Sequence, residues 1–171
     1  SALFAVETAL LDAYCRDRGI PLSELFGGAP ASVTTDITVP IVTPDAAAER
    51  ATRAAAAGFD HIKIKTGGAI DDDVARTVAV ADAAPDATIT VDANQGWTPK
   101  ATEQFVDEVT AAGVDLALVE QTTPKDDIRG LSRTRDRLSV PVAADEAVFT
   151  PADATAVVRD GAADVINVKL G

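Results

Sequence analysis

Short charged motifs recur along this chain at nearly even intervals, and each follows a run of residues typical of a β-strand. Counted from Lys65, the next four motifs follow at steps of 27, 28, 25 and 24 residues. This interval is about the length of one β-strand and one crossover helix, the unit that builds parallel α/β folds. The motifs are Lys63-Ile64-Lys65, Asp92-Ala93-Asn94, Glu120-Gln121, Asp145-Glu146 and Lys169. We therefore expect the charged side chains to surround one mouth, which in an α/β barrel is where the chemistry takes place.

The apolar pattern predicts six strands with a helix between each pair. The predicted strands are residues 35–39, 61–65, 88–91, 116–119, 141–144 and 165–170. Three of the helices carry start signals in which Thr is the N-cap and Pro takes the first helical position, namely Thr43-Pro44, Thr98-Pro99 and Thr150-Pro151. The other two are expected near residues 71–84 and 127–137, and an amphipathic helix over residues 2–18 precedes the first strand.

This alternation predicts an α/β fold with a parallel sheet. A closed (β/α) barrel needs eight strands, so we expect a partial TIM-like barrel in which six of the eight are present. The rival is an open doubly wound sheet, which usually has a Gly-rich phosphate turn after its first strand. Pro40-Ile41-Val42-Thr43 follows that strand instead, and Thr66-Gly67-Gly68 after the second is too short for a phosphate loop. Because the chain opens inside a helical pattern and stops just past a strand, we expect a fragment of a longer protein.

The amino-acid composition limits the class of protein, its compartment and its partners. A hydrophobic fraction of 47% suits one soluble domain with a real core, and no apolar run is long enough for a membrane span. The net charge is −12, with 20 aspartates against five lysines, which fits a surface adapted to a high-salt cytoplasm and argues against nucleic acid as a partner. The single cysteine, Cys15, excludes an internal disulfide, is expected in the core, and leaves a reducing cytoplasm as the default compartment.

The two lysines of the second strand, Lys63 and Lys65, point the same way because side chains alternate along a strand. Their Cα atoms lie ~7 Å apart. Like charges at this distance, when partly desolvated, lower each other's pKa, and a lysine tuned toward neutrality can abstract a proton. The alternative is a strand whose lysines only face solvent.

Three carboxylates, Asp92, Glu120 and Asp145, stand just past three consecutive apolar runs. A single carboxylate at such a place is often a loop-capping group. Three at one rim repel one another unless a cation neutralises them, and oxygen ligands suit a hard ion such as Mg²⁺. The single histidine, His61, begins a strand with no partner in sight, so a structural role is favoured over a ligand role.

The sixth strand brings Lys169, with Asn167 on the same side. In an eight-stranded barrel the sixth strand lies opposite the second, so Lys65 and Lys169 are expected to face each other across the mouth. A metal between them would bind a substrate carboxylate and stabilise the enediolate that forms when the adjacent carbon loses a proton. One lysine would remove that proton and the other return one on the opposite face. The outcome could be epimerisation, elimination or ring opening and closing.

This set of residues resembles the enolase superfamily, whose sites use a Lys or His base with Mg²⁺, and within it the mandelate racemase/muconate-lactonising subgroup. Further motifs are most similar to those of dipeptide epimerases of the L-Ala-D/L-Glu type. They are residues 35–39, Asp92-Ala93-Asn94-Gln95-Gly96-Trp97, Lys125-Asp126-Asp127, Ala144-Asp145-Glu146 and Phe149-Thr150-Pro151. Thr122-Thr123 departs from the proline-led turn that is usual after the fourth strand.

The resemblance implies a Mg²⁺-dependent isomerase acting on a small carboxylate such as a dipeptide, in a homo-oligomer. It implies Lys65 and Lys169 as acid/base groups, with Lys63 tuning Lys65 and helping to hold the substrate carboxylate. It implies Asp92, Glu120 and Asp145 as metal ligands, with Asn94 and Glu146 supporting them. Residues 1–32 would then link a capping domain to a catalytic partial barrel over residues 33–171. The alternatives are a cycloisomerase or an o-succinylbenzoate synthase on the same scaffold, or an inactive fragment.

Overall fold

The computed structural model describes residues 2–29 and 32–169 and divides them into two compact units. The larger unit is formed by residues 35–167, and the remaining described residues at both ends of the chain belong to the smaller one. Helices α1 (Ala2–Arg18) and α2 (Leu22–Leu25) lie in the smaller unit. The helix predicted over residues 2–18 is therefore confirmed, and Cys15 is buried as expected, whereas Leu3 and Leu10 on α1 are exposed.

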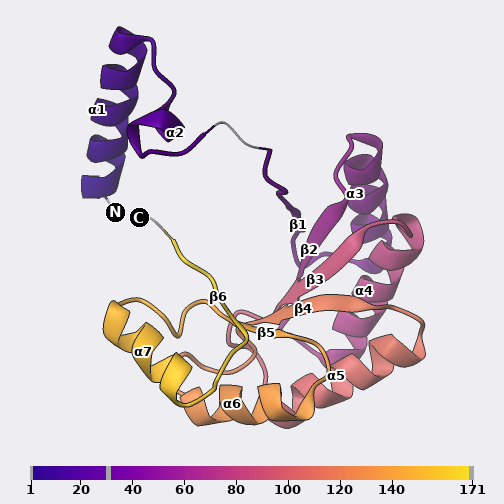
Figure 1. Cartoon of the computed structure of the whole chain (residues 1–171). Helices are drawn as coiled ribbons and strands as arrows, with labels where there is room; N and C mark the ends of the chain where they lie inside the picture. The colour runs from indigo at the N-terminus through magenta and orange to yellow at the C-terminus, as the bar shows by residue number, and fades with distance from the viewer. Residues whose placement is uncertain (1, 30–31, 170–171) are drawn as a thin grey trace. The chain divides into compact units, whose positions relative to one another are not determined.

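The larger unit is built on one parallel sheet of six strands whose spatial order follows the chain order, from β1 to β6 (Figure 1). The strands are β1 (Ile37–Val39), β2 (His61–Lys65), β3 (Thr88–Asp92), β4 (Leu116–Glu120), β5 (Val142–Ala144) and β6 (Val165–Ile166). Every neighbouring pair is parallel. The predicted α/β fold with six parallel strands is thus confirmed.

The helices that connect the strands lie along one face of the sheet (Figure 1). They are α3 (Pro44–Ala56), α4 (Ile70–Ala83), α5 (Pro99–Ala111), α6 (Ile128–Arg137) and α7 (Pro151–Arg159). The threonine caps form as predicted: Thr43, Thr98 and Thr150 accept hydrogen bonds from amides in the first turns of α3, α5 and α7. None of the described helices is both long enough and apolar enough to cross a membrane.

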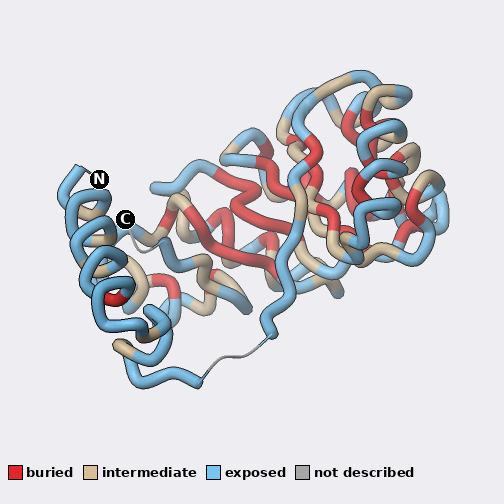
Figure 2. The backbone as a smooth tube through the Cα atoms, turned by 90° about the horizontal axis from the view of Figure 1, so that it is seen from above, coloured by how far each residue is buried: buried red, intermediate tan, exposed pale blue. Residues whose placement is uncertain are grey.

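The core lies between the sheet and these helices, and Figure 2 colours the buried residues red. In β2, Ile62 and Ile64 are fully buried, whereas Lys63 and Lys65 are half-buried. Because side chains alternate along a strand, both lysines point to the other face of the sheet. That face is therefore available to the charged residues.

Only β2 has exactly the predicted bounds; β3, β4 and β5 differ by one residue at one end, and the first and last strands differ by more. β1 begins at Ile37 rather than Thr35, because its register with β2 starts at the pair Ile37 and Ile62. β6 ends at Ile166 because only two of its residues pair with β5, although the Asn167 amide still donates to Ala144 O at 2.8 Å. Residue 170, in the predicted sixth strand, lies outside the described residues.

Candidate active site

A β-bulge places the acidic residues of β3 and β4 on one face. Ile89 pairs with Leu116, but Thr90 pairs with Leu118, so the register shifts by one residue between them. Because a shift of one residue turns a strand's side chains to the opposite face, the bulge decides which residue of β4 lies beside Asp92. The partner is Glu120 and not Val119, and Asp92 in turn pairs with Lys65 of β2.

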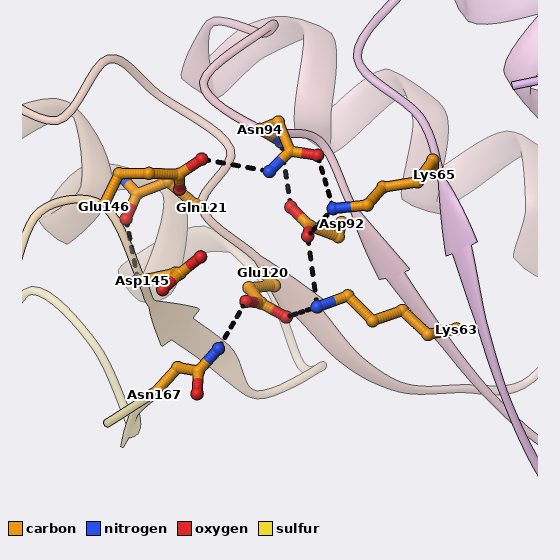
Figure 3. A network of polar contacts seen from close by, with 9 residues as sticks. All are labelled: Lys63, Lys65, Asp92, Asn94, Glu120, Gln121, Asp145, Glu146 and Asn167. Atoms are coloured by element: carbon orange, nitrogen blue, oxygen red, sulfur yellow. Dashed lines mark hydrogen bonds and ion pairs between the residues drawn. The ribbon is translucent and has the colours of Figure 1, made fainter. Parts of the chain in front are cut away.

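Two lysines and two carboxylates form a connected ion-pair network at the carboxyl ends of β2, β3 and β4 (Figure 3). Lys63 Nζ lies 2.5 Å from Glu120 Oε2 and 3.1 Å from Asp92 Oδ2. Lys65 Nζ lies 2.6 Å from the same Asp92 oxygen and donates to Asn94 Oδ1 at 2.7 Å. Asp92 and Glu120 are buried, so little water screens these contacts.

The pKa of Lys63 is shifted in the direction opposite to the expectation. Burial disfavours the charged amine, but the hydrogen bond from Lys63 to Glu120 and the negative charges of Asp92 and Glu120 outweigh burial and raise its pKa. Burial likewise opposes ionisation of Asp92, yet the hydrogen bond from Lys65 and the Asn94 amide keep its pKa low. The expected lowering is therefore wrong for Lys63, because the two carboxylates in contact with its amine stabilise the charged form.

A second layer of amides and carboxylates surrounds this network (Figure 3). Asn94 donates through Nδ2 to Glu146 Oε1 at 3.0 Å, and its backbone N–H donates to Asp92 Oδ1 at 3.0 Å. Asn94 adopts a left-handed conformation with φ 43°, which asparagine tolerates better than most residues. Asn167 Nδ2 donates to Glu120 Oε1 at 2.9 Å, which ties the residue after β6 to β4.

Gln121 is a residue whose role sequence reasoning missed. Its side chain is fully buried, and its Oε1 accepts from the backbone amides of Asp145 at 2.8 Å and Ala147 at 3.1 Å. Its Nε2 donates to Thr123 O at 3.0 Å. Gln121 therefore fixes the backbone turn that begins at Asp145, directly after β5. It also orders the Thr122-Thr123 segment that departs from the family pattern. The signal that could have revealed it is an amide side chain directly after the Glu120 carboxylate.

The donor set of Asp92, Glu120 and Asp145 fits a hard cation. All three side chains are buried at 1%, 5% and 6% exposure, and together they offer only oxygen ligands. Within residues 2–29 and 32–169 no group of three His, Cys, Asp or Glu is arranged as a metal cage, and lysine amines contact one oxygen each of Asp92 and Glu120. In the same part of the chain, Glu146 Oε2 is a buried atom without a hydrogen-bond partner. One buried carboxylate oxygen, on the residue that follows Asp145, therefore has no donor among the described residues.

Lys169 and His61 are two further residues that the sequence singled out. Lys169 is exposed and belongs to the smaller unit, so its role stays a prediction. His61 lies at the opposite end of β2 from Lys65, and its Nδ1 is 2.8 Å from Asp60 Oδ1. This contact agrees with the structural role favoured for His61.

Glycines hold the loops after β2 and β3 together. A Cβ added to Gly67 would overlap the carbonyl oxygen of Ala93, and a Cβ added to Gly96 would overlap the backbone of Gly67. Trp97 Nε1 also donates to Gly68 O at 3.3 Å. The loop that follows Lys65 is therefore in backbone contact with the loop that follows Asp92.

Gly96→Ala is expected to lower the free energy of unfolding by about 1–3 kcal/mol, the usual cost of overpacking a tight contact. Gly68→Ala is the matched control, because a Cβ there meets its nearest atom, Asp73 Oδ2, at 3.8 Å. Urea unfolding followed by circular dichroism measures both. Equal unfolding midpoints for the two variants would show that the loops are not held by this contact.

Comparison with known proteins adds the family. Residues 46–171 match the family model described as enolase C-terminal domain-like. The chain belongs to this family. This enolase-family chain is 39% identical to the L-Ala-D/L-Glu epimerase of Bacillus subtilis, over 99% of its own length and 47% of that protein's. The family resemblance drawn from the charged motifs is thereby confirmed.

Solved structures agree with the fold. A mandelate racemase/muconate lactonizing enzyme from Roseiflexus sp. superposes with a TM-score of 0.89 at 41% identity, covering 96% of this chain and 48% of that one. A dipeptide epimerase from Enterococcus faecalis, complexed with Mg and the dipeptide L-Leu-L-Tyr, superposes with a TM-score of 0.85 at 37% identity, covering 94% and 45%. The chain spans about half the length of the relatives it matches.

Proposed function

We propose that this chain provides acid–base and metal-binding residues of an epimerase that removes and returns the proton α to a carboxylate. The observation that carries the proposal is the network of Lys63, Lys65, Asp92 and Glu120 at the carboxyl edge of the sheet. Its two ammonium groups can hold an anionic carboxylate, and an amine on a fixed strand end can transfer a proton. The same edge is where barrel enzymes carry their reactive groups.

The roles follow from position. Lys65 is the amine with the larger exposed fraction, 31% against 16% for Lys63, so it is the one more open to a substrate carbon. Its Nζ would accept the α-proton once it is deprotonated. Lys63, held by Glu120 and Asp92, stays a cation that neutralises a substrate carboxylate. Lys169 is proposed as the second proton-transferring amine.

Asp92, Glu120 and Asp145 are proposed to hold a Mg²⁺ ion, as their buried oxygens suit it. When bound, the ion supplies positive charge where negative charge develops on the substrate carboxylate. Asn94 and Glu146 orient the cluster, since Asn94 contacts both Asp92 and Glu146.

A dipeptide is the proposed substrate, because some relatives that match nearly the whole chain are named dipeptide epimerases. We further propose residues 1–32 as the link from a capping domain and residues 33–171 as the catalytic barrel segment. The acidic composition supports a high-salt cytoplasm as the setting.

Deuterium exchange tests the proposed function. The intact protein is incubated with Mg²⁺ in deuterium oxide, with L-Ala-L-Glu and L-Leu-L-Tyr as separate substrates. We expect deuterium at the α-carbon beside the free carboxylate and formation of the second epimer, by mass spectrometry and chiral chromatography. No exchange with a broad dipeptide set, together with turnover of a muconate, would favour the cycloisomerase instead.

A further inference from the structure

A buried ion pair between the first and second turns of α4 is connected to the backbone around Lys65. We propose that Asp73 and Arg76 are positioning residues that set the direction in which the Lys65 side chain projects from the end of β2. This inference rests on the proposed function for its meaning, because it concerns the alignment of the proton-transferring amine. Its structural part can be measured without any catalysed reaction.

Asp73 holds the turn that follows Lys65. Its carboxylate is 1% exposed, and Oδ2 accepts from the amides of Gly67 at 2.9 Å and Gly68 at 2.8 Å. These amides are thereby used within the chain, which explains why the Thr66-Gly67-Gly68 segment is not a phosphate loop. Two amide bonds to one carboxylate oxygen fix the conformation of the backbone just past β2.

Arg76, one turn further along α4, connects the helix to the ends of two strands. Its Nη1 lies 2.5 Å from Asp73 Oδ1 and donates to the carbonyl oxygen of Lys65 at 3.2 Å. Its Nε donates to Val42 O at 2.8 Å, in the loop after β1. A planar guanidinium can serve these three acceptors at once, whereas a lysine amine on a flexible stem cannot hold the same geometry.

Helix capping alone does not account for this pair. Asp71 and Asp72 in the same turn are exposed and already place negative charge at the positive end of the α4 dipole. Burying Asp73 and Arg76 carries a desolvation cost that their many hydrogen bonds must offset. Since those bonds go to the Lys65 carbonyl and to Gly67 and Gly68, the pair acts on the end of β2.

The Thr66-Gly67-Gly68 turn also contacts the loop that carries Asn94, a partner of Lys65. Gly67 lies against Gly96 and Ala93, and Gly68 O accepts from Trp97 Nε1, so the turn is fixed to the loop that carries Asn94. Lys65 Nζ must lie between Asp92 Oδ2 at 2.6 Å and Asn94 Oδ1 at 2.7 Å. A displacement of about 1 Å at such a group can lower a rate about 100-fold.

The test compares Asp73→Asn and Arg76→Lys in the intact protein with two exposed controls, Asp72→Asn and Arg53→Lys. The readouts are kcat and KM for α-deuterium exchange of L-Ala-L-Glu, the rate at which an amine-modifying reagent labels Lys65, and amide hydrogen exchange of residues 66–69. We expect kcat to fall about 10- to 100-fold with KM changed less than about threefold. Lys65 labelling and loop exchange should rise about tenfold, with both controls unchanged.

A merely structural role gives a different pattern. It would lower the melting temperature while the folded fraction keeps its kcat and its Lys65 labelling rate, and this result would overturn the proposal. Because removing one charge leaves the other buried alone, the double variant Asp73→Asn/Arg76→Met removes both and should fold. If neither this variant nor Arg76→Lys folds, the pair serves the core, and the proposal also fails.

The two proposals can fail separately. If the wild-type protein exchanges no dipeptide, the proposed function is wrong. Labelling and hydrogen exchange still decide the positioning role in that case, because a change in Asp73→Asn but not in Asp72→Asn supports it. If neither Lys65 labelling nor hydrogen exchange changes in Asp73→Asn, the positioning role is rejected, even where the wild type is active.

Discussion

Lys65→Ala should lower the rate of dipeptide epimerisation by about 100- to 10,000-fold, the range that a general acid or base contributes. The variant removes the amine that lies between Asp92 and Asn94 at the strand end. Lys65→Arg should fail equally, because a guanidinium is not deprotonated in proteins. Chiral chromatography of the product over time measures both variants.

The loss of epimerisation activity in Lys65→Ala should come from the missing amine and not from unfolding of the protein. Asp92 keeps a cation in Lys65→Ala, because Lys63 Nζ is 3.1 Å from the same oxygen. The melting temperature should therefore change little. Lys100→Ala, which removes an exposed lysine on α5, is the control and should keep wild-type activity. Epimerisation at a wild-type rate in Lys65→Ala would contradict the role given to this amine.

Glu120→Gln should weaken Mg²⁺ binding by at least about 100-fold, since it removes the charge of one proposed ligand while keeping its shape. Activity should fall with it. The variant also weakens the contacts that Glu120 makes with Lys63 at 2.5 Å and Asn167 at 2.9 Å, so we expect about 1–3 kcal/mol of lost stability.

Isothermal titration calorimetry with Mg²⁺ checks the affinity, and urea unfolding checks the stability. Glu49→Gln, an exposed glutamate on α3 that pairs with Arg53, is the matched control and should leave both unchanged. Mg²⁺ binding in Glu120→Gln as tight as in the wild type would place the ion elsewhere.

The strand positions could be predicted from sequence because alternation and capping signals are local. β2 matches residue for residue, and its buried Ile62 and Ile64 identify the face of Lys63 and Lys65. The proximity of Asp92 and Glu120 was predicted from their spacing, but the bulge that turns Glu120 inward leaves no mark in the pattern of β4.

Other features depend on contacts between distant segments. Asp73 is one of three consecutive aspartates, and only folding shows that it alone is buried against a loop. The predicted shift of the Lys63 pKa is downward and the observed one is upward. The prediction considered the neighbouring lysine but not the carboxylates of β3 and β4. Gln121 acts on Asp145, 24 residues away, through backbone amides that the sequence does not reveal.

The most direct test is the stereochemistry of α-proton exchange in Lys65→Ala and Lys169→Ala, each given the two epimers of one dipeptide in deuterium oxide. Two amines on opposite sides of one carbon predict that each variant loses exchange from one epimer and keeps it from the other, with the losses reversed between variants. Exchange that persists from both epimers in both variants would contradict it.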